Sequence, residues 1–291
     1  MAPDNNYPQI KLALPKGRMQ AGVLALLAEA GIEVRAGERD YRPHISLEGF
    51  QAKILKPRNI VEMLQIGSRD VGFAGADWAA ELGADLIEIM DTGLDPVRVV
   101  AAAPAQLVTS GRLPDTRLVV ASEYERLTTS WIASCDMDAT FVRSYGATEV
   151  FPPEDADCIV DNIATGSTLR ANGLVEVDWL MASSTRLYAN PRTMDDAAQR
   201  ESIERFALLL RSVLESRLRV MVEVNVGATC LESVIDVLPC MREPTISCLH
   251  GDNGFAVKAA VPRAELPRVI PEIKARGGTD IVVTTLAQIV P

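Results

Sequence analysis

Apolar residues in the first third of the chain recur with two different spacings. Short apolar runs at Gln9–Leu14, Ala52–Leu55 and Asp70–Ala74 predict strands, whereas the apolar positions of Met19–Ala30 recur at helical spacing and end at Gly31. Strands that alternate with helices predict a mainly parallel sheet, with ligands near the carboxyl ends of its strands. The same spacings predict two further helices at Arg58–Ile66 and Asp77–Leu82. They also predict two further strands at Leu86–Met90 and Val97–Ala102.

A second α/β unit is predicted from about Val97 to Arg186. It contains apolar runs typical of strands at Arg117–Ala121 and Thr140–Val142, with a helical segment near Leu127–Ser134 between them. Met194–Arg217 then carries an apolar stripe at helical spacing, which predicts one long helix.

The pattern changes after Arg217, where six short elements follow in the order strand, helix, strand, strand, helix, strand. This order is typical of a ferredoxin-like domain. Pro271 falls inside the second predicted helix, so that helix is expected to be kinked or to start later. The six predicted elements are Arg219–Val226, Leu231–Leu238, Thr245–His250, Phe255–Val261, Glu265–Arg276 and Asp280–Thr285.

The composition fits this α/β organisation and excludes some partners. The 291 residues are rich in aliphatic side chains and only 5% aromatic, as expected for strands covered by helices. A net charge of −10 argues against a nucleic-acid surface. The five cysteines lack metal-type spacing and are interpreted as reduced thiols. Because Met1–Asn6 is polar and no run reaches roughly 18 apolar residues, we expect a cytoplasmic protein without a membrane span.

The most informative stretch is Asp157–Leu174, where an apolar run ends in Asp161 and a turn of small hydroxylated residues follows. Thr165, Gly166, Ser167 and Thr168 offer consecutive backbone N–H groups at a predicted helix start, which suits a phosphate. Asp161 can accept hydrogen bonds from sugar hydroxyls. For the four turn residues alone, a strand, a turn and a capped helix without any ligand is the favoured interpretation, and the eighteen-residue string shifts it to a ligand loop.

Two cations directly follow the first predicted strand. Lys16 and Arg18 can neutralise a polyphosphate there, and the Arg18 guanidinium can bind it in a bidentate manner. A solvated basic turn is the alternative. In the block after the third strand, Gly75 permits a tight turn and Asp77 either caps the next helix or contacts a ligand.

These motifs together resemble the ATP phosphoribosyltransferase family, in its long form. The resemblance rests on the Asp157–Leu174 string, on Leu14–Met19 and on the block that runs from Lys56 to Asp77, and it extends to Val283. Ser122–Tyr124 and Gly146–Val150 resemble two further segments of the family, which make Tyr124 a candidate to stack on adenine and Glu149 a candidate to contact ribose or magnesium.

Three residues depart from the family pattern. Lys56 stands where the family usually has Arg, and Asn59 where it usually has Asp. Lys keeps the charge without the planar fork and Asn removes a charge, so substrate or metal binding can be altered. Cys240 stands where Gly is common, which bears on inhibitor binding.

The resemblance implies that the 5-phosphoribosyl group of phosphoribosyl diphosphate is transferred to N1 of ATP, with Mg²⁺ on the diphosphate. It implies feedback inhibition by histidine, a homohexamer, and a catalytic part of two lobes like the periplasmic binding proteins, followed by an ACT-like regulatory domain.

The expected domains are 1–96 with 190–217, 97–189 and 218–291. The expected catalytic residues are Lys16, Arg18 and Asp161, and the magnesium ligands are left unassigned. The expected substrate-binding residues are Asp77, Tyr124, Glu149, Asp157, Thr165, Gly166, Ser167, Thr168 and Leu169.

Three alternatives remain open from the sequence. The chain can be a two-lobed small-molecule binding module, or a catalytically weakened relative that keeps the fold, as Lys56 and Asn59 allow. Transfer to a different base is chemically close to the implied reaction.

Overall fold

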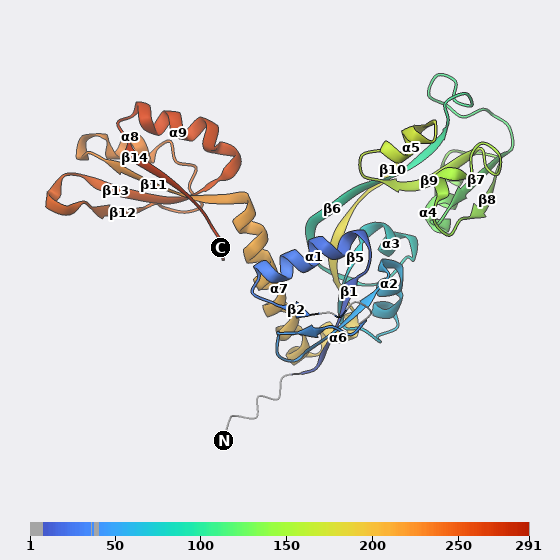
Figure 1. The fold of residues 1–291 in the computed structure, drawn as a ribbon, viewed down its shortest axis with the longest axis horizontal. Helices are drawn as coiled ribbons and strands as arrows, with labels where there is room; N and C mark the ends of the chain where they lie inside the picture. The colour runs from blue at the N-terminus through green and yellow to red at the C-terminus, as the bar shows by residue number, and fades with distance from the viewer. Residues whose placement is uncertain (1–7, 36, 38–40, 291) are drawn as a thin grey trace. The chain divides into compact units, whose positions relative to one another are not determined.

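The chain forms two compact units in the computed structural model, which describes residues 8–35, 37 and 41–290 (Figure 1). One unit comprises Met1–Ala25 and Ile32–Glu204, and the other comprises Leu26–Gly31 and Arg205–Pro291. The polar segment Met1–Asn6, on which the prediction of no export signal depends, lies outside the described residues. Within the described part of the chain, no helix is both long and apolar enough to cross a membrane.

The first unit is built on one eight-stranded sheet with the strand order β4-β1-β5-β10-β6-β9-β7-β8. Parallel pairs occupy both ends of the sheet, where β1 pairs with β4 and β5, and β7 pairs with β8 and β9. The strands are β1 (Ile10–Pro15), β4 (Phe50–Leu55), β5 (Val71–Gly75), β6 (Ile87–Pro104), β7 (Leu118–Ser122), β8 (Ala139–Arg143), β9 (Cys158–Ile163) and β10 (Leu174–Ala189), and a separate pair is formed by β2 (Val34–Arg35) and β3 (His44–Ile45).

The centre of the sheet is antiparallel, so the prediction of a mainly parallel sheet is wrong there. β10 pairs antiparallel with β5 and β6, and β6 pairs antiparallel with β9. The sequence predicted two strands where β6 is one, because Gly93, Asp95 and Pro96 are typical of a turn. Continuous pairing with β10 carries β6 through them with several register shifts. β10 itself was not predicted as a strand.

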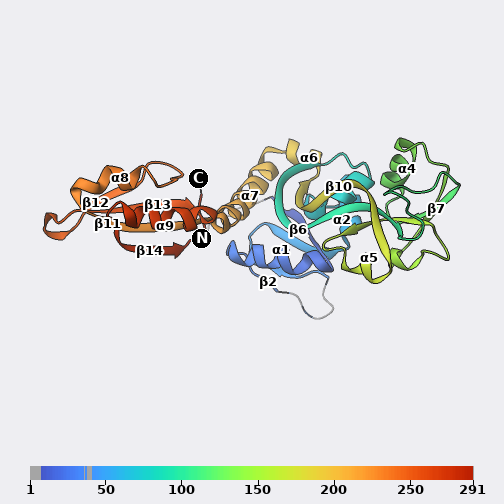
Figure 2. The ribbon, with the colours of Figure 1, turned by 90° about the horizontal axis from the view of Figure 1, so that it is seen from above.

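These two long strands join two lobes of the first unit, as both views show (Figures 1 and 2). The first lobe contains β1, β4 and β5, and the second contains β7, β8 and β9. In the second lobe both faces of the sheet bury aliphatic side chains, with Ile159 in one cluster and Val160 in the other. The helices are α1 (Arg18–Glu29), α2 (Pro57–Gln65), α3 (Ala76–Glu81), α4 (Glu125–Ser134), α5 (Ser167–Ala171), α6 (Pro191–Asp195) and α7 (Ala197–Leu218), with a 3₁₀ turn η1 (Thr148–Val150).

The predicted single helix Met194–Arg217 is two helices. Asp196 is extended between α6 and α7, and its side chain accepts hydrogen bonds from the backbone N–H groups of Ala198 and Gln199 at 3.0 and 2.9 Å. An Asp in this position caps a helix N-terminus and therefore ends the continuity that the apolar stripe suggested.

The C-terminal domain confirms the ferredoxin-like prediction. Its sheet order is β12-β13-β11-β14, and all three pairings are antiparallel. β11 alternates buried and half-buried residues, and its four buried valines pack against α8 and α9 (Figure 1). The α-helical part of α9 begins at Leu266, one residue after the predicted start, and continues through Pro271. The elements are β11 (Arg219–Val226), η2 (Ala228–Cys230), α8 (Leu231–Ile235), β12 (Thr245–Cys248), η3 (His250–Asp252), β13 (Phe255–Pro262), η4 (Arg263–Glu265), α9 (Leu266–Ala275) and β14 (Thr279–Thr285).

Candidate functional site

The hydroxylated turn lies between β9 and α5 and lines a cavity of about 280 Å³. Gly166 has a φ of +70° at the start of α5, a conformation that side-chain-bearing residues rarely adopt. The Thr165 hydroxyl donates to Ser167 Oγ at 3.0 Å and accepts from the Ser167 N–H at 3.4 Å. Thr168 and the largely buried Leu169 complete this wall of the cavity. The turn therefore presents N–H groups and hydroxyls to a space that can hold an anion.

Asp161 closes the cavity from the end of β9. Its Oδ1 accepts a hydrogen bond from the Asn162 N–H at 2.7 Å. Burial is the main reason that the pKa of the Asp161 carboxyl rises to about 7, and the nearby carboxylates Glu149 and Glu123 raise it further while Arg18 opposes them. A partner that brings positive charge or hydroxyl donors would favour the ionised carboxylate.

Arg18 lies at the start of α1, directly after β1, and lines both the cavity of Asp161 and a neighbouring cavity of about 200 Å³. Lys16 lines only the second cavity. Its ammonium donates to the Tyr41 hydroxyl at 2.9 Å and lies 4.8 Å from the centre of that ring. The two cations that follow the first strand therefore face the space next to the hydroxylated turn.

The second cavity combines these cations with an apolar wall formed by Met19, Pro57, Trp78 and Val97. The Arg58 guanidinium lies 5.7 Å from the centre of the Trp78 ring. A flat apolar group bearing phosphates fits this combination, because aromatic and apolar side chains bind the ring and cations bind the phosphates.

Asp77, which lines the second cavity, and Tyr124, which lines neither cavity, meet in a buried hydrogen-bond network. The Tyr124 hydroxyl donates to Asp77 Oδ2 at 2.5 Å, and the Ser183 hydroxyl donates to Asp77 Oδ1 at 2.7 Å. Asn162 Nδ2 donates to the Tyr124 hydroxyl at 2.7 Å. Four segments that are distant in the sequence therefore share one polar chain.

The helix-cap expectation for Asp77 and the stacking expectation for Tyr124 are wrong, whereas a ligand contact of Asp77 stays a prediction because Asp77 lines the second cavity. Gly75, not Asp77, occupies the N-cap of α3, and no side chain caps that helix; the Asp77 carboxylate is held instead by Ser183 and Tyr124. Tyr124 has an exposed fraction of 0%, and its ring lies 4.8 Å from that of Trp78. The buried ring cannot stack on adenine in this arrangement, and Trp78 is the aromatic side chain that lines the cavity.

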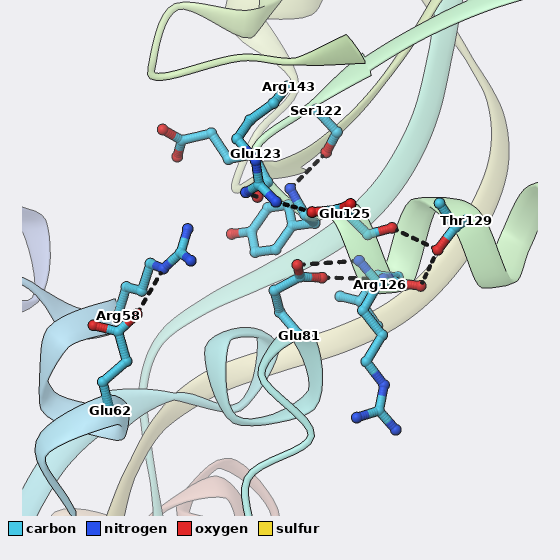
Figure 3. A network of polar contacts seen from close by, with 11 residues as sticks. Arg58, Glu62, Glu81, Ser122, Glu123, Glu125, Arg126, Thr129 and Arg143 are labelled. Carbon is cyan, nitrogen blue, oxygen red and sulfur yellow. Dashed lines mark hydrogen bonds and ion pairs between the residues drawn. The ribbon is translucent and has the colours of Figure 1, made fainter. Parts of the chain in front are cut away.

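Glu81 makes a second connection between the lobes (Figure 3). Its carboxylate accepts hydrogen bonds from the backbone N–H groups of Arg126 and Leu127 at 3.1 and 3.0 Å, in the first turn of α4. α4 has no side-chain cap at its own N-cap residue, so the buried carboxylate of α3 satisfies these donors.

The two remaining predicted residues, Glu149 and Asp157, lie in different places. Glu149, in η1, lines the same cavity as Asp161. Asp157 lies at the other end of the strand, where Oδ2 accepts from the Val119 N–H at 2.7 Å, and it is not among the lining residues of this cavity. Its observed contact joins β9 to β7, so the structure provides no support for a role in binding substrate.

Several residues that line the two cavities were not predicted from the sequence. Asn162 lines both cavities, and Trp78, Asp95 and the run Ser183–Thr185 line the second. The consecutive hydroxyl residues Ser183–Thr185 are the one visible signal, and it points to a site only once β10 is known to be a strand of the central sheet.

A larger cavity of about 460 Å³ lies elsewhere, around Trp131 and the end of α4. Its polar side chains are mostly carboxylates, including Asp178, which accepts from Trp131 Nε1 at 2.9 Å. None of the residues expected to bind phosphate lines it, so the two smaller cavities form the candidate site.

Comparisons with known proteins agree with this arrangement. The sequence profile described as ATP phosphoribosyltransferase matches residues 56–212, and that of the HisG C-terminal domain matches residues 217–288. The ATP phosphoribosyltransferase of Chlorobium phaeobacteroides is 34% identical over 283 residues, which is 96% of this chain and 96% of that protein. That of Pelotomaculum thermopropionicum is 31% identical and covers 97% of this chain and 100% of its own length.

Among solved structures, the ATP phosphoribosyl transferase (HisG:HisZ) complex from Thermotoga maritima contains a similar chain. It is 25% identical with a TM-score of 0.63, and the match covers 71% of this chain and 99% of that one. The matched profiles, the near-complete relatives and the fold therefore agree, and the chain belongs to the ATP phosphoribosyltransferase family.

Proposed function

We propose that this protein transfers the 5-phosphoribosyl group of phosphoribosyl diphosphate to N1 of ATP and releases pyrophosphate. The observation that carries the proposal is that Arg18 lines both cavities, one with the hydroxylated turn and the buried Asp161, the other with Lys16 and Trp78. Adjacent sites for two phosphorylated substrates are what this reaction requires, since bringing two reactants together supplies much of the rate enhancement.

Phosphoribosyl diphosphate would occupy the first cavity. The N–H groups and hydroxyls of Thr165–Thr168 would hold its 5-phosphate, and the Asp161 carboxylate would accept hydrogen bonds from the ribose hydroxyls. Because Asp161 and Glu149 line the same cavity, their negative charge would also stabilise the positive charge that develops on the sugar as the diphosphate leaves.

The diphosphate would lie toward Lys16 and Arg18, which can neutralise the leaving group. Mg²⁺ fits this site as a companion of the diphosphate. Among the described residues no group of three potential ligands surrounds a single point, and Mg²⁺ is usually held by one or two carboxylates together with substrate phosphates. Glu149 and Asp161 are the residues that would hold it, and it would polarise the departing diphosphate.

ATP would occupy the second cavity, with adenine against Met19, Pro57 and Trp78. Two departures from the family pattern are close in sequence to Pro57, which lines this cavity. Lys56 precedes α2, and Asn59 donates from Nδ2 to Glu62 Oε2 at 2.9 Å, so the Asn59 amide is held on its own helix.

The family also supports proposals on regulation and organisation. We propose catalytic lobes 1–96 with 190–217 and 97–189, a regulatory domain 218–291 that binds histidine as inhibitor, a homohexamer, and a cytoplasmic location. Cys240 packs half-buried against the core of the C-terminal domain, which is a structural role for the residue.

The test is the ultraviolet absorbance of the N1-substituted product, followed with ATP, phosphoribosyl diphosphate, Mg²⁺ and a pyrophosphatase, with and without histidine. A signal that requires both substrates and is lost in Asp161→Asn with the fold intact is expected. A flat trace from folded protein that still binds phosphoribosyl diphosphate would instead indicate a weakened relative or a binding module.

A further inference from the structure

Asn162 occupies the border between the two cavities. It follows Asp161 on β9 and, together with Arg18, lines both the cavity of the hydroxylated turn and the cavity of Trp78. A side chain in this position can contact the atoms of one substrate that lie closest to the other. Neither the phosphate-binding turn nor the two cations explain why an amide stands here.

The hydrogen-bond network determines how the Asn162 amide is turned. The Tyr124 hydroxyl donates its single proton to Asp77 Oδ2, whose carboxylate also accepts from Ser183. Burial first, and then the neighbouring Asp77, raise the pKa of Tyr124 well above its ordinary value, so the hydroxyl keeps that proton. It must therefore accept from Asn162, which assigns Nδ2 to the 2.7 Å contact with Tyr124.

The amide oxygen of Asn162 consequently points away from Tyr124. Within the described part of the chain it has no hydrogen-bond donor, and it is not among the buried polar atoms that lack a partner. Asn162 Oδ1 is therefore an acceptor that is neither buried nor bonded within the protein. It is open to the two cavities that Asn162 lines.

We propose that Asn162 Oδ1 accepts a hydrogen bond from the 6-amino group of the adenine of ATP, and so selects 6-aminopurines and turns N1 toward the sugar. This inference rests on the proposed function. In adenine the 6-amino group is adjacent to N1, so a residue at the border of the two cavities reaches it when N1 faces phosphoribosyl diphosphate. The ribose hydroxyls already have an acceptor in Asp161. Of the carboxylates that line the second cavity, Asp77 accepts from Tyr124 and Ser183, and Asp95 Oδ2 accepts from Thr185. Asn162 Oδ1 stands at the border of the two cavities without a donor in the described part of the chain.

The test compares ATP with purine riboside triphosphate, which lacks the 6-amino group and keeps N1. Their kcat/KM values are measured for the wild type, for Asn162→Leu, and for Asn253→Leu as a matched change of an exposed Asn in the C-terminal domain. We expect Asn162→Leu to lower the preference for ATP about tenfold, while the KM for phosphoribosyl diphosphate stays within about twofold. Asn253→Leu is expected to leave the preference unchanged. Intrinsic differences in the reactivity of N1 cancel in this comparison.

Two results would overturn the inference. An equal loss with both nucleotides would mean that Asn162 only supports the fold, and a selective rise in the KM for phosphoribosyl diphosphate would mean that its oxygen binds the ribose. If Asn162→Leu does not fold, Asn162→Ala is used in its place. Should the wild type show no turnover, which would refute the proposed function, the same ratio is read from the Kd values of the two nucleotides by calorimetry.

Discussion

Tyr124 and Asp77 come from different lobes of the eight-stranded sheet and meet in its interior, where the phenol hydroxyl donates a 2.5 Å hydrogen bond to the carboxylate. The same hydroxyl accepts from Asn162, so one oxygen links α3, α4 and β9. A buried polar chain of this kind specifies one arrangement of its members only when every donor and acceptor is paired.

Tyr124→Phe is therefore expected to destabilise the protein by about 1–3 kcal/mol, because it leaves a carboxylate oxygen and an amide N–H without their partner. Urea unfolding measures the change. Tyr145→Phe removes a hydroxyl from a residue that is 87% exposed and is expected to change stability by less than about 0.5 kcal/mol. Equal stabilities for the two variants would contradict the role assigned to the network.

Glu81→Ala removes the carboxylate that accepts from the first turn of α4 (Figure 3). The loss of a helix cap and of two buried acceptors is expected to cost about 1–3 kcal/mol. Glu204→Ala, an exposed position on α7, is the control and is expected to be nearly neutral. Because Glu81 lies outside both cavities, the variant that remains folded should keep the wild-type KM for phosphoribosyl diphosphate. A large rise in that KM at full stability would show that the residue acts on the site instead.

Asp161→Asn is expected to change the pH dependence of stability. The pKa of this carboxyl is about 7 in the folded protein against an ordinary value of 3.8, so folding takes up a proton between these values. The contribution of the Asp161 carboxyl to the free energy of unfolding is fully present below about pH 4. It is lost as the pH rises through 7, and it does not return at higher pH. The Asn variant escapes the loss, and we expect it to be about 1–3 kcal/mol more stable than the wild type at pH 8.5 and nearly equal at pH 4.

Urea unfolding at several pH values follows this difference. Asp138→Asn, which replaces an exposed carboxyl, is the matched control. A gap between wild type and Asp161→Asn that is constant from pH 4 to 8.5 would contradict the raised pKa as its cause.

Arg18→Met is expected to lower kcat/KM by about 100-fold, because one guanidinium faces both substrates and its contacts strengthen as the diphosphate leaves. Arg18→Lys is expected to recover only part of the loss, since the ammonium keeps the charge without the bidentate geometry. Steady-state kinetics with each substrate varied gives the values, and the exposed Arg112→Met, outside both cavities, is the control. Full activity of Arg18→Met would contradict the proposed contacts of Arg18 with the substrates.

Those parts of the protein whose signal lies within a few neighbouring residues could be predicted without the structure. The alternation of Arg219–Val226 predicted β11 with its bounds, because one face of a strand that packs on helices must be apolar at every second residue. Asp161 and the hydroxylated turn were likewise visible as a candidate site, because the residues of such a turn are consecutive in the sequence.

Tertiary structure alone decided the rest. The turn-like residues of β6 form one continuous strand because β10 pairs with them, and that partner lies far along the chain. The sequence made Asp77 either a helix cap or a ligand contact, and the family resemblance made Tyr124 a candidate to stack on adenine. The sheet order instead brings Asp77 to Ser183 and Tyr124 to Asn162 in the interior. A polar side chain takes whichever partner the packed fold places within hydrogen-bond distance, and that partner cannot be seen from its neighbours in sequence.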